Sequence, residues 1–128
     1  MKKTILLVAL LTSTSANADL LCRGKVNVNN VGLTSTQDAT VYLDHSFLVY
    51  TGPHASIDLG KTVKLAYKKS GNTYRADASK QTHGGETNLF QVDVASDSLS
   101  AKFSYLGTYG YTARGDLQCA TASQVQFE

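Results

Sequence analysis

The sequence predicts an all-β protein, built as a single small antiparallel barrel or two-sheet sandwich of about eight or nine short strands. Three observations support this class. Apolar and polar residues alternate repeatedly with a period of two, which is typical of strands with one buried and one wet face. The chain is rich in Thr, Ser, Val and Tyr, which suit pleated surfaces. No segment carries a sustained apolar stripe at helical spacing.

The N-terminal segment, residues 1–18, is predicted to be a cleavable secretory signal peptide. Two lysines precede an apolar run over residues 5–11, and Ala-Asn-Ala at 16–18 is a small-x-small cleavage site. The apolar run is too short to span a bilayer of about 30 Å. Residues 19–128 then form a single β-domain, which we expect to be periplasmic or secreted from a bacterium.

Two cysteines, Cys22 and Cys119, lie near opposite ends of this domain, and we predict that they form a disulfide bond. Export would place them in an oxidising compartment. Lipidation of Cys22 would require a small preceding residue, whereas Leu21 stands there. Neither cysteine has a second Cys or a His at ligand spacing, so we predict no metal site. The bond would tie the first strand to the last.

Alternating runs mark the predicted strands in chain order, and turn-forming residues separate them. Ser70-Gly71-Asn72 and Ser96-Asp97-Ser98 are expected to be hairpin tips. The members expected to face the core are Cys22, Gly24, Val26 and Val28; Ala39, Val41 and Leu43; Val63, Leu65 and Tyr67; Phe90, Val92 and Val94; and Leu99, Ala101, Phe103 and Tyr105.

The last strand lies in the tyrosine-rich stretch Ser104–Cys119. If this strand runs without a bulge, Tyr109 and Tyr111 share the inward face of Cys119. They are then core residues with hydroxyls at the rim, and not a stacking platform. A bulge at Gly115 would reverse this parity.

The charge balance argues against nucleic acid as a partner. The full chain has twelve Lys and Arg against ten acids, and loss of two lysines with the signal leaves ten of each. No basic cluster remains that could match a phosphate backbone. We also expect no membrane insertion, because outer-membrane strands need about 9–11 residues and most runs here have about seven.

Candidate binding residues lie on predicted loops and on one unusual strand. Residues 47–50 are apolar without alternation, so this strand is either covered on both faces or presents an apolar patch to a partner. The best-placed loops are residues 44–53 and 79–88. The binding candidates are Tyr42, Phe47, Tyr50, His45, His54 and His83.

Catalytic motifs are missing from the sequence. We find no serine-hydrolase elbow, calcium loop, phosphate-binding loop or dinucleotide fingerprint, and we predict no cofactor and no catalytic residue. His45 and His54, which a strand separates, are a candidate acid–base or metal pair if the fold brings them together.

The export signal, the size and the disulfide-closed β-domain resemble, in architecture only, small periplasmic inhibitors such as those of lysozymes. We therefore expect an exported, soluble, non-enzymatic domain that binds a protein or an envelope glycan. The alternatives are a small periplasmic hydrolase using a carboxylate or histidine pair, and a structural or membrane-associated envelope component.

Overall fold

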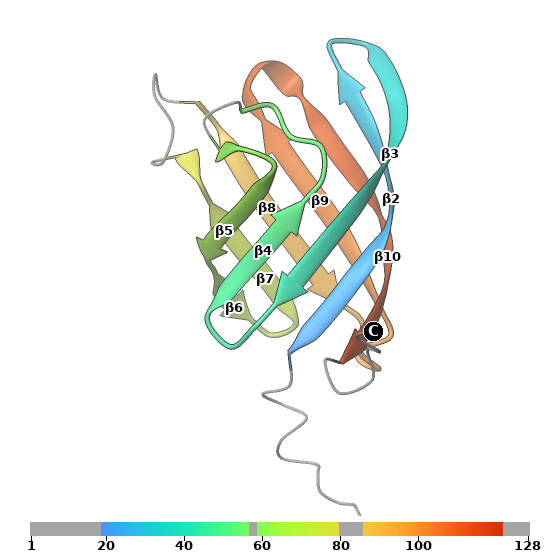
Figure 1. Ribbon diagram of the computed structural model, residues 1–128, viewed down its shortest axis with the longest axis vertical. Coiled ribbons are helices and arrows are strands. Elements are labelled where there is room, and N and C mark those ends of the chain that lie inside the picture. The colour runs from blue at the N-terminus through green and yellow to red at the C-terminus, as the bar shows by residue number, and fades with distance from the viewer. Residues whose placement is uncertain (1–18, 57–58, 80–85, 122–128) are drawn as a thin grey trace, which may run out of the picture.

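The computed structural model describes residues 19–56, 59–79 and 86–121, which form one antiparallel sheet curled into a nearly closed barrel (Figure 1). The all-β prediction is confirmed. The predicted signal peptide, residues 1–18, lies outside the described residues. The strands are β2 (Leu20–Asn30), β3 (Leu33–Leu43), β4 (Phe47–Thr51), β5 (Thr62–Ala66), β6 (Lys68–Ser70), β7 (Thr73–Asp77), β8 (Asn88–Val94), β9 (Ser100–Gly107) and β10 (Thr112–Thr121), with a 3-10 turn, η4 (Thr108–Gly110), before β10.

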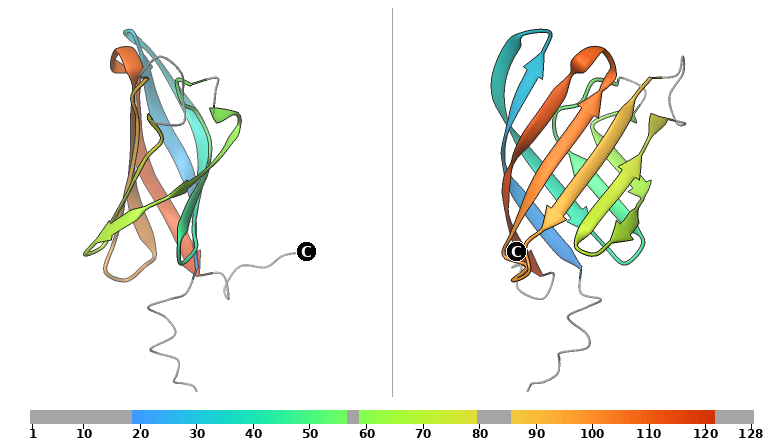
Figure 2. Two further views of the ribbon diagram at one scale, coloured as in Figure 1. Left: turned by 90° about the vertical axis from the view of Figure 1, so that its left-hand side faces the viewer. Right: turned by 180° about the vertical axis from the view of Figure 1, so that it is seen from behind.

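The strand order is β5-β4-β3-β2-β10-β9-β8-β7-β6, and every neighbouring pair is antiparallel. β5 and β6 are consecutive parts of one stretch, interrupted at Tyr67. The first part pairs with β4 and the second pairs with β7, so the two ends of the sheet meet at Tyr67. Figure 2 shows the resulting curl from two further sides. Of the two predicted architectures, the barrel is the one observed.

The predicted disulfide bond is confirmed, and it joins β2 to β10 inside the barrel. Cys22 and Cys119 stand directly opposite each other in the register of these strands, with their Cα atoms 4.0 Å apart. Both side chains are buried. The bond therefore fastens the first strand of the barrel to the last.

In every strand except β6, whose three residues are exposed, alternate side chains face the interior, as the period-two pattern predicts. The largest fully buried ones are aromatic: Tyr50, Phe90, Phe103 and Tyr105. The rings of Tyr50 and Phe103 stack with centroids 5.0 Å apart, and those of Phe90 and Tyr105 lie 4.8 Å apart. Burial of each such side chain contributes about 1.5–3 kcal/mol, so this aromatic cluster is a main source of stability.

Two residues that were predicted to lie in the core, Leu99 and Tyr109, are on the surface, and both lie at turns. Leu99 is 54% exposed, because Ser98 has a left-handed backbone (φ 60°) and β9 begins only after it. Tyr109 is 92% exposed, because its φ of 61° places it in the turn before β10. Tyr111, two residues later, packs edge-on against Tyr105 as parity predicts.

β10 runs without a bulge, and Gly115 allows its close approach to β2. Arg114 lies opposite Asn27 and Leu117 lies opposite Gly24, so the register with β2 is the same before and after Gly115. A Cβ at position 115 would lie 2.3 Å from the carbonyl oxygen of Lys25, which is far inside contact distance. Only glycine therefore fits at this point of the β2–β10 pair.

Candidate functional site at the mouth of the barrel

One end of the barrel, uppermost in Figure 1, is closed by the segment that follows β4. Pro53 and Ser56 in this segment are buried. The Tyr50 hydroxyl donates a hydrogen bond to the carbonyl oxygen of Pro53 at 2.5 Å. The backbone N–H of Ala55 donates to the Tyr105 hydroxyl oxygen at 3.1 Å. The core tyrosines thus hold residues 52–56 across this end.

His54, Ser56 and Glu86 come together in the same closed end. The Ser56 hydroxyl donates to Glu86 Oε1 at 2.9 Å, and the Ser56 backbone N–H donates to His54 Nδ1 at 3.2 Å. His54 Nε2 then carries the ring proton and donates to the carbonyl oxygen of Gly60 at 2.5 Å. Both imidazole nitrogens are bonded to backbone groups, so the ring is not placed to accept the proton of the Ser56 hydroxyl. This cluster fixes the loop.

His45 and His54 lie at opposite ends of the barrel, because β4 runs between them. The histidine pair considered as an acid–base or metal pair is therefore not brought together. Within residues 19–56, 59–79 and 86–121, no group of three or more His, Cys, Asp or Glu side chains could hold a metal ion. His83 lies outside the described residues.

The other end of the barrel opens into a pocket of about 530 Å³, which we call the mouth. This volume lies within the range of about 300–1,000 Å³ that is usual for small-molecule sites. The turns after β3, β6 and β8 surround it, together with the first residue of β2 and the last residue of β10. Its lining residues are Leu20, Leu43, Asp44, His45, Tyr67, Lys69, Asn72, Tyr74, Val94, Ala95, Ser96, Ser98 and Thr121.

An aromatic pair forms one wall of the mouth. The half-buried rings of Tyr67 and Tyr74 meet edge to face with centroids 5.0 Å apart. Burial raises the pKa of Tyr67, and its hydroxyl donates to the carbonyl oxygen of Asp44 at 2.7 Å. The ammonium nitrogen of Lys69 lies 5.2 Å from the centroid of Tyr74. The wall therefore combines apolar ring surface with a positive charge.

Asp44 shapes the rim of the mouth through the turn between β3 and β4. Its Oδ1 accepts hydrogen bonds from the backbone N–H groups of Ser46 at 2.7 Å and Phe47 at 2.5 Å. These bonds lower the pKa of Asp44, so its carboxyl group is ionised at neutral pH. A fixed carboxylate of this kind suits an acceptor of hydrogen bonds and does not suit a general acid.

The predicted binding residue Tyr50 is fully buried and belongs to the core. β4 directs Leu48 and Tyr50 inward and Phe47 and Val49 outward. Phe47 is 37% exposed and Val49 is half-buried. The apolar strand is thus covered on its inner face and partly open on its outer face, so the fold does not cover it on both faces.

Tyr42 and Phe47 lie on the outside of the barrel and do not line the mouth. The Tyr42 hydroxyl donates to the carboxylate of Asp19, and this bond raises the pKa of Tyr42. The ammonium of Lys64 lies 4.5 Å from the centroid of the Phe47 ring. Among the predicted binding residues that the structure describes, His45 is the one that lines the mouth.

Sequence reasoning missed Tyr67, Lys69, Asn72 and Tyr74 as parts of one site. Parity correctly placed Tyr67 on the inner face, but it could not show that the barrel ends at this level. The signal that could have found them is the predicted hairpin tip at Ser70-Gly71-Asn72, since inward residues beside a tip lie at a barrel opening.

Comparison with protein-family models, curated proteins and solved structures finds no match for this chain. No helix among the described residues is long and apolar enough to cross a membrane.

Proposed function

We propose that this chain is an exported, non-enzymatic binding protein whose mouth takes the end of an envelope glycan that carries a carboxylate. The observation that supports this most is the wall of the mouth, where Tyr67 and Tyr74 lie beside the ammonium of Lys69. The Cys22–Cys119 disulfide is consistent with an oxidising compartment outside the cytoplasm.

The chemistry of the mouth matches such a ligand in three respects. Tyrosine rings offer apolar faces to the C–H groups of a sugar, while the Tyr67 hydroxyl is held by the carbonyl oxygen of Asp44. An ammonium group forms strong, charge-assisted hydrogen bonds with a carboxylate. Polar side chains at the turns, such as Asn72 and Ser96, can bond sugar hydroxyls. The pocket is open on one side, so it accommodates a chain end.

The number of carboxylic acids among the described residues that line the mouth favours binding without cleavage over the hydrolase alternative. Glycoside hydrolysis uses two carboxyl groups about 5–10 Å apart, one of which donates a proton. Among the described residues that line the mouth, Asp44 is the one carboxylic acid. Its carboxylate is engaged with the backbone of the β3–β4 turn.

Calorimetric titration with two disaccharides tests the proposal. N-acetylglucosaminyl-N-acetylmuramic acid carries a carboxylate, and N,N′-diacetylchitobiose is its neutral counterpart. We expect the acidic disaccharide to bind roughly 10- to 100-fold more tightly, because a hydrogen bond to a charged group contributes about 1.5–3 kcal/mol. We expect Lys69→Gln to abolish this preference and Tyr74→Leu to weaken both ligands.

Lys68→Gln is the matched control, because Lys68 is the adjacent lysine, is exposed and does not line the mouth. It should leave both affinities unchanged. Failure of the acidic disaccharide to bind, or an equal loss in the Lys68 and Lys69 variants, would contradict the proposal. Circular dichroism of each variant establishes that the barrel is folded.

A further inference from the structure

β3 has a free edge at the closed end of the barrel. The strand pairs with β2 over its whole length, from Leu33 to Leu43, whereas β4 pairs only with residues 40–43. None of the described residues pairs with the other side of residues 33–39. The β2–β3 hairpin consequently projects past its neighbour β4 (Figures 1 and 2).

The chain path explains why this edge is open. After Thr51 the backbone leaves the sheet and turns inward, where Tyr50 binds the carbonyl oxygen of Pro53. A Cβ at Gly52 would lie 2.7 Å from the Tyr50 hydroxyl oxygen, so the turn is tight. Residues 52–56 close the end of the barrel and therefore do not continue β4 along residues 33–39 of β3.

The alternation of the ladder identifies the backbone groups on the free side. At the β3–β4 turn the N–H of Asp44 donates to the carbonyl oxygen of Phe47 at 3.0 Å. Residues of β3 at even positions therefore direct their N–H and C=O groups toward the β4 side, as alternation in an antiparallel ladder requires. On the free edge these residues are Thr34, Thr36 and Asp38, and all three are exposed.

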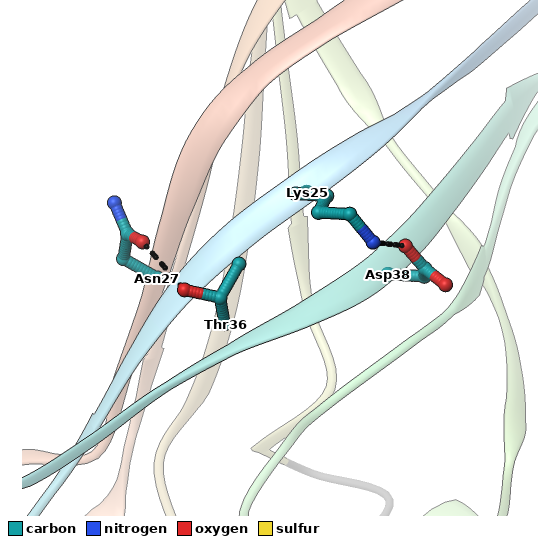
Figure 3. A network of polar contacts seen from close by, with 4 residues as sticks. All are labelled: Lys25, Asn27, Thr36 and Asp38. Atoms are coloured by element: carbon teal, nitrogen blue, oxygen red, sulfur yellow. Dashed lines mark hydrogen bonds and ion pairs between the residues drawn. The ribbon is translucent and has the colours of Figure 1, made fainter.

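The usual protection of an edge strand is missing along these residues. Natural sheets block exposed edges with Lys, Pro, bulges or inward charges. Residues 33–37 read LTSTQ, with no charge and no proline. The charge of Asp38 is already paired with Lys25 at 2.6 Å on the adjoining strand, and Asn27 accepts a bond from Thr36 nearby (Figure 3). This network holds the hairpin while leaving its outer edge open.

We propose that a second copy of the chain adds to this edge as an antiparallel strand, with a two-fold axis at Thr36. In this register Thr36 faces Thr36 of the other copy, and Thr34 faces Asp38 of the other copy. Every free N–H and C=O group of the three residues then finds a partner. No like charges face each other, and a threonine hydroxyl stands beside each Asp38 carboxylate.

The fit of the edge to itself favours a second copy over another protein. A two-fold interface must be self-complementary, and the register at Thr36 meets that condition without a change in the strand. The formal net charge of the chain is only +2, so repulsion between copies is weak. Because β3 reverses across the axis, the two mouths lie at opposite ends of the dimer and stay open. This inference does not depend on what the mouth binds.

Cysteine cross-linking on the full chain tests the register. The two-fold axis places the Cα atoms of residue 36 about 5.5 Å apart, within disulfide reach. In Thr34→Cys, the matched control, the two cysteines are offset by four residues, roughly 13 Å along the strand. We expect Thr36→Cys to give a covalent dimer on a non-reducing gel and Thr34→Cys to give none. Peptide mapping should show Cys22–Cys119 intact in both.

Sedimentation analysis supplies the second test. We expect the unmodified chain to pass from monomer to dimer as its concentration rises. Thr36→Pro should stay monomeric with an unchanged circular dichroism spectrum, because the lost N–H faces the free edge and not β2. A monomer at all concentrations, equal cross-linking of the two cysteine variants, or a dimer that survives Thr36→Pro would overturn the proposal.

Discussion

Reduction of the Cys22–Cys119 bond is expected to lower the free energy of unfolding by about 4.7 kcal/mol at 25 °C. The bond spans a sequence separation of 97 residues, nearly the whole described chain. In the chain-entropy model, the closed loop lowers the conformational entropy of the unfolded chain by about 2.1 cal/mol/K plus a part that grows with the logarithm of loop length. Reduction restores this entropy and so stabilises the unfolded state. The folded barrel keeps its other strand pairs, so it changes little on reduction.

Urea denaturation of the oxidised and the reduced protein measures this effect. With a slope of about 1–3 kcal/mol per molar urea, the midpoint should fall by roughly 1.5–5 M on reduction. The variant Cys22→Ala/Cys119→Ala should match the reduced protein, apart from the cost of the small cavity it creates. If reduction moves the midpoint by less than a few tenths molar, the bond does not act by closing a loop, and this reasoning fails.

Two further predictions concern backbone fit and ionisation. Gly115→Ala should lower the free energy of unfolding by more than about 2 kcal/mol, because the added methyl group meets the carbonyl oxygen of Lys25. Gly32→Ala, which has open space around it but a φ of +83°, should lower it by only about 1 kcal/mol. If thermal unfolding shows equal losses for the two variants, the close approach at Gly115 is refuted. Burial raises the pKa of Tyr50 and Tyr105 above the ordinary value of 10. The folded state then holds protons that the unfolded state loses, so stability should fall as pH rises above 10, and a flat profile in urea denaturation between about pH 9 and 11 would contradict this.

The strands could be predicted from the sequence because burial in a small barrel has a period of two. Val26 and Val28 face the core as their alternation indicates, and Cys22 meets Cys119 across the first and last strands. These features depend on regular geometry, which a pattern of residue types records directly.

The errors fall where the chain departs from regular geometry. Ser98 and Tyr109 adopt positive φ values although neither is glycine, and nothing in their residue types marks this. Tyr50 belongs to a run with no alternation, so parity could not decide which side it faces. The mouth could not be predicted for another reason. It is formed where the strands end in space, and Tyr67 lines it because this residue lies at the height where the barrel ends.

Nuclear magnetic resonance titration of the isotopically labelled domain with N-acetylglucosaminyl-N-acetylmuramic acid tests the central claim most directly. Backbone amide shifts report which end of the barrel meets the ligand. We predict that the largest changes occur at residues 44–45, 67–69 and 72–74 around the mouth, with little change at residues 52–56 in the closed end. No change at the mouth, or changes concentrated at residues 52–56, would contradict the assignment of the mouth as the binding site.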